Sequence, residues 1–265
     1  RRMNHLSKMH ERFLRSRQAF DPGAKSWYRM EKKEDRAEVF IYDGIGMFGV
    51  EAESFIAQIN ALEVKTIDLR INSPGGNVFD GTAIYNALRR HKAQVNVKID
   101  GLAASMASII ALAGDTVEMA DNAFYMIHMP FSLVVGNSDD MRKEADVLDK
   151  LADQAVSTYA NNSSLSEEEA RAAMREETWY TAEEAKEVGF IDSIYDGESE
   201  EMRFDLSVFA KAPDGISSSS EQSLTARELE MALRDLGASR KQACEVASIY
   251  SQGQRDSVPS QRDAA

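Results

Sequence analysis

The stretch DGLAASMAS, residues 100–108, places Ser105 among alanines and a glycine at the start of an apolar run. The small neighbours would let a substrate backbone approach the hydroxyl closely. A helix that begins here would offer free N–H groups and a positive potential where an oxyanion forms. Serine is also among the preferred N-cap residues. Ser105 is therefore either a helix cap or a nucleophile.

A serine hydroxyl attacks a carbonyl only when an adjacent base takes its proton. Of the four histidines, His5 and His10 lie in a polar leader and His91 lies in the polar helix end LRRHK. His128 ends the apolar run FYMIH, where a strand would hold the imidazole rigidly. This residue is either a general base for Ser105 or a histidine of the core.

The loop SPGG, residues 73–76, follows an apolar strand and precedes a helical stretch. Two glycines in a row expose backbone N–H groups that no side chain shields, which suits a carbonyl oxygen or a peptide strand. A tight strand-to-helix turn would have the same composition. The loop lacks the G-x-x-x-x-G-K-[ST] pattern, so it does not favour nucleotide binding.

The overall composition excludes several classes of protein. The 265 residues include 31 Lys and Arg against 44 Asp and Glu, for a net charge of −13, which argues against a general nucleic-acid binder. Cys244 is the only cysteine, so a disulfide framework and a thiolate metal cluster are excluded, and a cytoplasmic compartment is expected. No apolar run approaches the roughly 18 residues of a membrane span, and the basic start lacks a signal-peptide apolar region. We expect neither export nor a membrane span.

Short β-branched runs alternate with helical stretches, which predicts an α/β fold. The expected strands are residues 38–42, 66–72, 95–100, 115–120 and 124–128, and the expected helices are 51–62, 78–90, 138–160 and one that starts at Ser105. Residues expected to face the core are Phe55, Ile59, Leu62, Val78, Ile84 and Leu88. Loops between such elements are where functional groups usually lie.

The longest expected helix, 138–160, carries an apolar stripe that packs on the core or makes an oligomer contact. The stripe comprises Met141, Ala145, Leu148, Leu151 or Ala152, Ala155 and Tyr159, and Ser138 or the following Asp pair is the expected N-cap. Capping-box spacing also predicts two helices, opened by Ser166 with Glu169 and by Thr181 with Glu184.

The predicted organisation is one domain with appendages. The parts are a basic N-terminal arm over residues 1–36, the α/β domain over 37–196, an acidic to Ser-rich linker over 197–221, a small helical appendix over 222–252 and a disordered tail over 253–265.

Four stretches occur in an order that resembles a known family: INSPGGNVFDGTAIYNAL, GLAASMAS, MIHMP and ETWYTAEEAKEVGFID. The chain resembles, over about residues 36–195, the Clp protease proteolytic subunits and, among them, the Clp-like head maturation proteases of tailed bacteriophages. The resemblance implies a Clp-protease/crotonase-like spiral of strand-strand-helix units with a long oligomerisation helix. It implies a serine endopeptidase with a Ser-His-acid triad, in which Ser105 is the nucleophile and His128 the base. The oxyanion-hole amides map onto Gly76 and Met106.

The acid of the triad departs from the usual family pattern. Family members usually carry Asp just before an aromatic residue, whereas this chain has Glu177 in EETWYTA. Glu can orient an imidazole as Asp does, although its extra methylene requires a different approach. The alternative is that Glu176 and Glu177 form a solvated acidic pair.

The resemblance further implies that no metal or organic cofactor is needed, and that the chain forms a heptamer-based homo-oligomeric ring that cleaves polypeptides. The phage relatives suggest a capsid or scaffolding protein as substrate, in the host cytoplasm or the procapsid, with neither nucleic acid nor membrane as partner. Alternatives are a general Clp-type subunit that works with a separate ATPase, a crotonase-like CoA-thioester enzyme, a Ser-Lys dyad peptidase, and a non-enzymatic scaffold.

Overall fold

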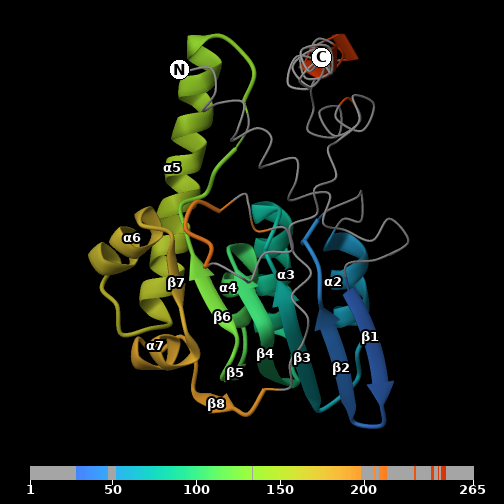
Figure 1. Ribbon diagram of the computed structural model, residues 1–265. Helices are drawn as coiled ribbons and strands as arrows, with labels where there is room; N and C mark the ends of the chain where they lie inside the picture. Colours follow the sequence, from blue (N-terminus) through green and yellow to red (C-terminus); the bar gives the residue numbers. More distant parts are fainter. Residues whose placement is uncertain are drawn as a thin grey trace, which may run out of the picture.

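A computed structural model describes residues 28–46, 52–132 and 134–197, together with Leu206, residues 209–213 and a few positions between 230 and 248. These residues form an α/β fold in which helices pack on an eight-stranded mixed sheet (Figure 1), as the sequence predicts. The strands are β1 (Tyr28–Lys33), β2 (Arg36–Ile41), β3 (Thr66–Ser73), β4 (Gln94–Ala104), β5 (Thr116–Ala120), β6 (Phe124–Ile127), β7 (Thr178–Tyr180) and β8 (Ser193–Tyr195). The helices are α2 (Ala52–Asn60), α3 (Val78–Arg90), α4 (Met106–Ala111), α5 (Ser138–Asn161), α6 (Glu167–Arg175) and α7 (Ala182–Glu187). In the part of the chain that is described, no helix is both long and apolar enough to cross a membrane.

The strand order is β1-β2-β3-β4-β5-β8, and β6 lies beside β4 and pairs in turn with β7. Strands β2, β3, β4 and β5 run parallel, because helical crossovers α2 and α3 return the chain to the same end of the sheet. Strand β7 is antiparallel to β6. Functional groups at the carboxyl ends of parallel strands therefore meet at one edge of the sheet.

Strand β4 is long and serves two neighbours in succession. Its first half, residues 96–99, pairs with β5, and its last three residues, 102–104, pair with β6. Gly101 lies at the change of partner, where an added Cβ would come within 3.0 Å of the Asn72 side chain. The sheet thus divides at β4, and the second branch carries the chain to the loop that contains Ser105.

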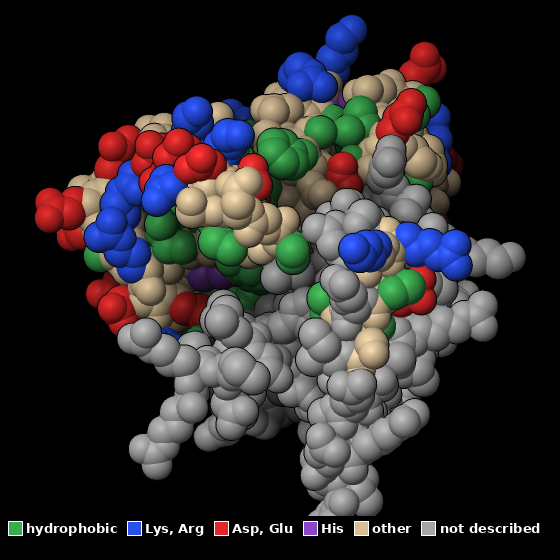
Figure 2. Space-filling view, turned by 90° about the horizontal axis from the view of Figure 1, so that it is seen from above, with side chains coloured by type: hydrophobic (Ala, Val, Ile, Leu, Met, Phe, Trp, Pro, Cys, Tyr) green, Lys and Arg blue, Asp and Glu red, His purple; other side chains and the backbone are tan. Residues whose placement is uncertain are grey.

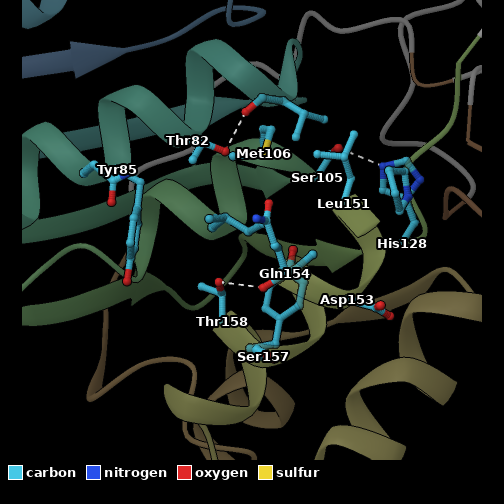
Figure 3. Close-up of a pocket in the computed structure, with 16 residues that line it drawn as sticks. Thr82, Tyr85, Ser105, Met106, His128, Leu151, Asp153, Gln154, Ser157 and Thr158 are labelled. Atoms are coloured by element: carbon cyan, nitrogen blue, oxygen red, sulfur yellow. Dashed lines mark hydrogen bonds between the residues drawn. The ribbon is translucent and has the colours of Figure 1, made fainter. Parts of the chain in front are cut away.

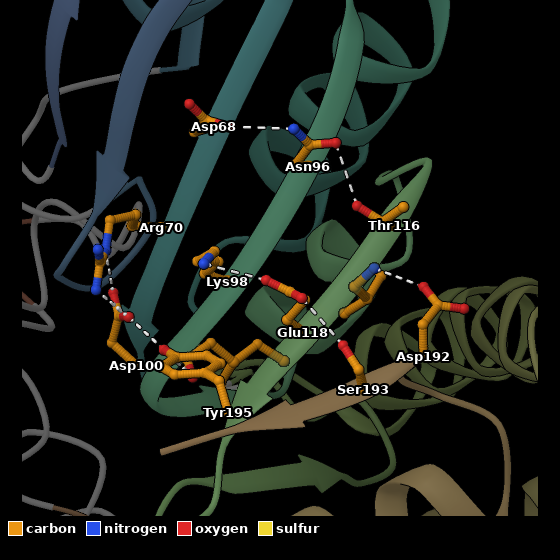
Figure 4. A network of polar contacts seen from close by, with 12 residues as sticks. Asp68, Arg70, Asn96, Lys98, Asp100, Thr116, Glu118, Asp192, Ser193 and Tyr195 are labelled. Carbon is orange, nitrogen blue, oxygen red and sulfur yellow. Dashed lines mark hydrogen bonds and ion pairs between the residues drawn. The ribbon is translucent and has the colours of Figure 1, made fainter. Parts of the chain in front are cut away.

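Alternation along the central strands decides which face is buried. Ile67, Leu69 and Ile71 of β3 are fully buried and lie in register with Val95, Val97 and Ile99 of β4. The intervening side chains form polar ladders on the opposite face (Figure 4). These ladders join Asp68 to Asn96 and Thr116, Lys98 to Glu118 and Ser193, and Arg70 to Asp100 and Tyr195.

The helices confirm most of the expected buried positions. Phe55, Ile59, Ile84 and Leu88 are buried in the core, and Leu62 and Val78 pack against it while partly exposed. The capping boxes of α6 and α7 form as the spacing predicts, with the hydroxyls of Ser166 and Thr181 accepting from backbone N–H groups three residues on.

The predicted boundary between the N-terminal arm and the α/β domain is wrong. Residues 28–33, placed in the arm, form edge strand β1, which pairs with β2 throughout its length. The reason is a short alternating pattern: Tyr28 and Met30 pack against the core, and the Tyr28 ring meets Phe55 edge-on at 5.1 Å. The remainder of the arm, residues 1–27, lies outside the described residues.

Helix α5 differs from the prediction in its cap and in its stripe. Asn137 is the N-cap, with Asp140 completing a capping box, because the amide oxygen of Asn137 reaches the N–H groups of the two residues after Ser138. Only the C-terminal half packs on the core, through Ala152, Val156 and Tyr159. The first half extends beyond the sheet (Figure 1), and Met141 there is 50% exposed.

Part of the predicted linker belongs to the fold. Leu206 and Phe209, within the range 197–221, are buried and pack against Leu102, Ala104 and Met126. Two apolar side chains three residues apart suffice to attach this otherwise polar stretch to the sheet. The tail 253–265 and most of the helical appendix 222–252 lie outside the described residues.

Candidate active site

Ser105 lies between β4 and α4 in a conformation that side chains rarely adopt. Its φ of 55° and ψ of −126° fall outside the usual regions, and its side chain makes no cap hydrogen bond. The backbone is fixed by a hydrogen bond from the Ser105 N–H to the Met126 carbonyl at 3.0 Å. The sharp turn from strand to helix leaves the hydroxyl free for another partner, which decides against the capping interpretation.

That partner is His128. The His128 Nε2 atom lies 2.8 Å from the Ser105 Oγ atom (Figure 3). The register of β4 against β6 explains this distance, because Ala104 pairs with Met126 and the two chains continue side by side past that pair. The adjacency of the two residues therefore follows from strand pairing between segments more than twenty residues apart.

Aromatic rings pack around the His128 imidazole. Phe131 lies 5.6 Å away in a tilted arrangement, and Phe209 meets the ring edge-on at 5.4 Å. Burial lowers the pKa of His128 to about 4, and the nearby Glu177 carboxylate acts in the opposite direction. At neutral pH the imidazole is thus neutral, the form that a general base requires.

Glu177 reaches the site through a third strand. Strand β7 pairs with β6 so that Ile127, the last residue of β6, lies opposite Thr178, which brings the adjoining residues His128 and Glu177 close together. Glu177 itself adopts a φ of 50° in the tight turn between α6 and β7. A hydrogen bond of 3.0 Å from the Met129 N–H to the Met174 carbonyl holds this turn against the segment after β6.

The Glu177 carboxylate is held chiefly by backbone amides. Its Oε2 atom accepts from the Ala210 N–H at 2.8 Å and its Oε1 atom accepts from the Lys211 N–H at 2.6 Å. The Trp179 indole donates a longer bond of 3.4 Å. Among the described contacts of this carboxylate, none is a hydrogen bond to His128, although its charge acts on that imidazole.

Glu176 has a different environment. Its side chain is 75% exposed and pairs with the Lys211 ammonium at 2.6 Å. This contact lowers the pKa of Glu176. The two neighbouring carboxylates are therefore not an equivalent solvated pair: Glu177 faces the site and Glu176 faces solvent.

The glycine loop lies against the turn that holds Ser105. A Cβ on Gly75 would come within 2.7 Å of the Ser105 Cβ and within 2.8 Å of the Met106 nitrogen. The Ile45 N–H donates to the Gly75 carbonyl and the Asn77 N–H donates to the Ile45 carbonyl, so the N–H of Gly76 lies outside this bridge. Met106, the first residue of α4, carries an N–H with no acceptor within its own helix. The two amides predicted for an oxyanion hole thus belong to backbone segments in contact.

A pocket of about 480 Å³ opens beside Ser105 and His128. Its walls come from α3 and α5, with Thr82 and Tyr85 facing Gln154 and Thr158 (Figure 3). Asp153 is the one acidic residue of the lining, and the lining described contains no Lys or Arg. The pocket can accept an uncharged side chain next to the reacting hydroxyl.

The sequence prediction missed the residues that anchor Glu177. Phe209, Ala210 and Lys211 fall in a stretch predicted to be a linker. The available signal was the pair Leu206 and Phe209, two large apolar residues within an otherwise polar and Ser-rich region.

Two comparisons with known proteins give matches to this chain. The family model described as Clp protease matches residues 23–198. The ATP-dependent Clp protease proteolytic subunits of Streptococcus pneumoniae serotype 4 (strain ATCC BAA-334 / TIGR4) and strain R6 (ATCC BAA-255) are each 38% identical over 151 residues, which cover 54% of this chain and 77% of the relative. The chain belongs to the Clp protease family, a family of serine proteases.

Proposed function

We propose that this protein is a serine endopeptidase in which Ser105 is the nucleophile, His128 the general base and Glu177 the acid of the triad. The observation that carries the proposal is the 2.8 Å contact between the His128 Nε2 and the Ser105 Oγ atoms. It occurs at a serine whose strained backbone and uncapped side chain have no structural use of their own.

The mechanism is acyl transfer. Neutral His128 takes the Ser105 proton while the oxygen attacks the peptide carbonyl, and the N–H groups of Gly76 and Met106 stabilise the oxyanion. The imidazolium returns its proton to the leaving amine, and the acyl-enzyme remains on Ser105. Water then attacks the ester with His128 again as base, which releases the acid product and restores the hydroxyl. Glu177 stabilises the imidazolium at both steps.

The pocket indicates the class of residue beside the cleaved bond. Because its described lining has one carboxylate and is otherwise neutral, a peptide with an uncharged side chain should be preferred over one with an acidic side chain. Fluorogenic peptides that differ only at this position test the preference.

The direct test of the activity compares hydrolysis of a fluorogenic peptide by the wild type, Ser105→Ala and Ser108→Ala. Ser108 is the control because it lies in α4, three residues after Ser105, and its buried hydroxyl bonds the Tyr159 hydroxyl and the Ser105 carbonyl, not the His128 imidazole. Ser105→Ala should lose turnover by about six orders of magnitude, while Ser108→Ala should keep it. Normal hydrolysis by Ser105→Ala would refute the proposal.

For the substrate in the cell, we propose capsid or scaffolding proteins during phage head maturation, because the sequence resembles the head maturation branch of this family. The alternative is a general proteolytic subunit with a separate ATPase, as the names of the Streptococcus relatives indicate for those proteins. Co-expression with a capsid or scaffolding protein, without any ATPase, should yield cleavage that Ser105→Ala abolishes. Degradation only after an ATPase is added would favour the alternative.

Clp proteases form oligomeric rings, and the same arrangement is proposed here, with seven subunits to a ring and the active sites facing an enclosed chamber. The support in this chain is the exposed apolar side chains on the first half of α5. Such a chamber would lie in the host cytoplasm or the procapsid.

A further inference from the structure

The segment made of Leu206 and residues 209–213 lies against the strand ends that carry Ser105, His128 and Glu177. Leu206 is fully buried and Phe209 is 7% exposed, in one cluster with Leu102, Ala104 and Met126. These three partners directly precede the catalytic segments of β4 and β6. We call Leu206 and residues 209–213 the docking segment.

The docking segment supplies the strongest contacts of the Glu177 carboxylate. Two N–H groups in sequence, from Ala210 and Lys211, each bind one oxygen at 2.8 and 2.6 Å. Hydrogen bonds to a charged acceptor are about twice as strong as neutral ones. An ionised carboxylate has about four lone-pair sites, so these amides still leave sites for the N–H of an imidazole.

Phe209 closes the same side of His128. Its ring meets the imidazole edge-on at 5.4 Å and the Trp179 indole edge-on at 5.7 Å. The apolar ring covers part of the imidazole and excludes water there. The burial that favours neutral His128 thus depends partly on a residue outside the strand ends.

The docking segment does not occupy the substrate side of the site. The described lining of the pocket beside Ser105 comes from α3, α4, α5 and the residues after β6, and includes neither Leu206 nor any of residues 209–213. A segment that blocked the active site would fill that pocket. The docking segment instead lies behind the imidazole, at the position of a support.

Resting on the proposed function, we propose that the docking segment is a positioning element of the active site, which anchors Glu177 through the Ala210 and Lys211 amides and seals His128 with Phe209. The need follows from the acid itself: Glu has one more rotatable bond than Asp, so its carboxylate needs additional fixing to serve the imidazole. Ala210 and Lys211 do this through their backbone N–H groups.

The first test removes one amide. Lys211→Pro deletes the N–H that binds the Glu177 Oε1 atom, whereas Lys211→Ala keeps this N–H and removes only the ammonium that pairs with Glu176. Lys211→Pro should lower kcat by about 100-fold with little change in KM, because misplacement of a catalytic group by about 1 Å has effects of that size. Lys211→Ala should remain close to the wild type. Thermal melting of both variants checks that the fold is retained.

The second test measures the pKa of the His128 imidazole by NMR and does not depend on activity. Two charged side chains share the site with His128: Glu177, and Asp153 of α5, which pairs with Arg171 at 2.7 Å. In Phe209→Ala, water reaches the imidazole, so the His128 pKa should rise from about 4 toward the ordinary 6.5. Phe209→Leu, which keeps an apolar side chain, should restore the low pKa.

Equal kcat for Lys211→Pro and Lys211→Ala, or an unchanged His128 titration in Phe209→Ala, would overturn the positioning role. A gain in activity in either test variant would also overturn it and would make the segment inhibitory. A failure of the proposed function would look different. Hydrolysis would then persist in Ser105→Ala, both with the wild-type docking segment and with each of its variants.

Discussion

Ser105 occupies the place where a serine normally caps a helix, yet its side chain points to an imidazole instead. A backbone with φ of 55° is unfavourable for a residue with a Cβ, by roughly 1 to 3 kcal/mol, and such strain persists only where the surroundings impose it. Here the conformation is held by the hydrogen bond that the Ser105 N–H donates to the Met126 carbonyl. At the scale of single residues, three side chains in unusual settings define the site: a strained serine, a buried histidine and a glutamate at positive φ.

The pH dependence of activity should reflect the buried histidine. A general base works only when neutral, so with a pKa of about 4 the kcat/KM should stay high at pH 6 and fall as the pH drops through about 4. An unperturbed histidine would give a midpoint near 6.5. Rates with a fluorogenic peptide between pH 3.5 and 8 measure the midpoint, and circular dichroism at each pH separates titration from unfolding.

The same shift affects folding stability. The unfolded chain takes up a proton on His128 near pH 6.5 and the folded chain only near 4, so the contribution of His128 to stability is present above 6.5 and declines as the pH falls toward 4. His128→Gln should therefore flatten the dependence of the urea midpoint on pH across this range. An unchanged dependence would contradict the buried, neutral state of the imidazole.

The two glutamates should behave differently. Glu177→Gln removes the charge beside His128 and should lower kcat by about two to four orders of magnitude, as the loss of an orienting carboxylate does. Glu176→Gln changes an exposed side chain paired with Lys211 and should be nearly silent. Steady-state kinetics of the two variants test which glutamate is the acid of the triad. A large loss in Glu176→Gln with a silent Glu177→Gln would assign that role to Glu176.

At the scale of elements, the site is a product of strand register. Residues far apart in the chain meet because β4 and β7 both pair with β6, and each supplies the residue just past its last pair. Helix α4 and the glycine loop lie beside Ser105 and carry the N–H groups proposed for the oxyanion hole.

The glycine loop can be tested against another glycine with positive φ, away from the site. Gly76 has a φ of 150° and an added Cβ would lie 2.1 Å from the Ile45 carbonyl, whereas Gly189 has a φ of 83° and no neighbour nearer than 3.5 Å. Gly76→Ala should displace the N–H proposed for the oxyanion hole and lower kcat by about 100- to 1,000-fold. Gly189→Ala should reduce the melting temperature but leave kcat unchanged. Similar kcat values for the two variants would argue against a catalytic role for the loop.

The helices and strands could be predicted from the sequence better than the contacts that hold them together. Strong alternation and capping signals located the central strands and α6 and α7, because these signals are local. The partner of the Glu177 carboxylate was not predictable, since it depends on backbone amides that carry no sequence signature. Likewise, β1 and the docking segment each place two large apolar side chains against the core, which is too short a pattern to distinguish from a loop.

At the scale of the whole molecule, apolar surface remains exposed. Seen from above, acidic and basic side chains lie interspersed and hydrophobic side chains gather between them (Figure 2). Exposed large apolar residues include Phe79, Phe131, Val135, Met141 and Val147. The first half of α5 extends away from the sheet, which suits contact with another copy of the chain better than a free surface (Figure 1).

Assembly should therefore depend on the apolar stripe of α5. Met141 and Leu148 are seven residues apart and share one face of the helix, so Met141→Asp with Leu148→Asp would place two charges in the proposed contact. Light scattering should show a ring of the wild type and a much smaller species of the double variant. Lys143→Asp, on the opposite face, is the control and should assemble normally. A wild type that stays monomeric at micromolar concentration would contradict the ring.

We propose that strand pairing makes Ser105 the nucleophile, and covalent labelling distinguishes Ser105 from the other serines of the chain. A fluorophosphonate reacts only with a serine hydroxyl activated by a base, and peptide mass spectrometry of the labelled full chain identifies which serine carries the adduct. We expect one adduct, on Ser105, that is lost in Ser105→Ala and His128→Ala and retained in Ser108→Ala. An adduct on another serine, or labelling of Ser105 that persists without His128, would contradict it.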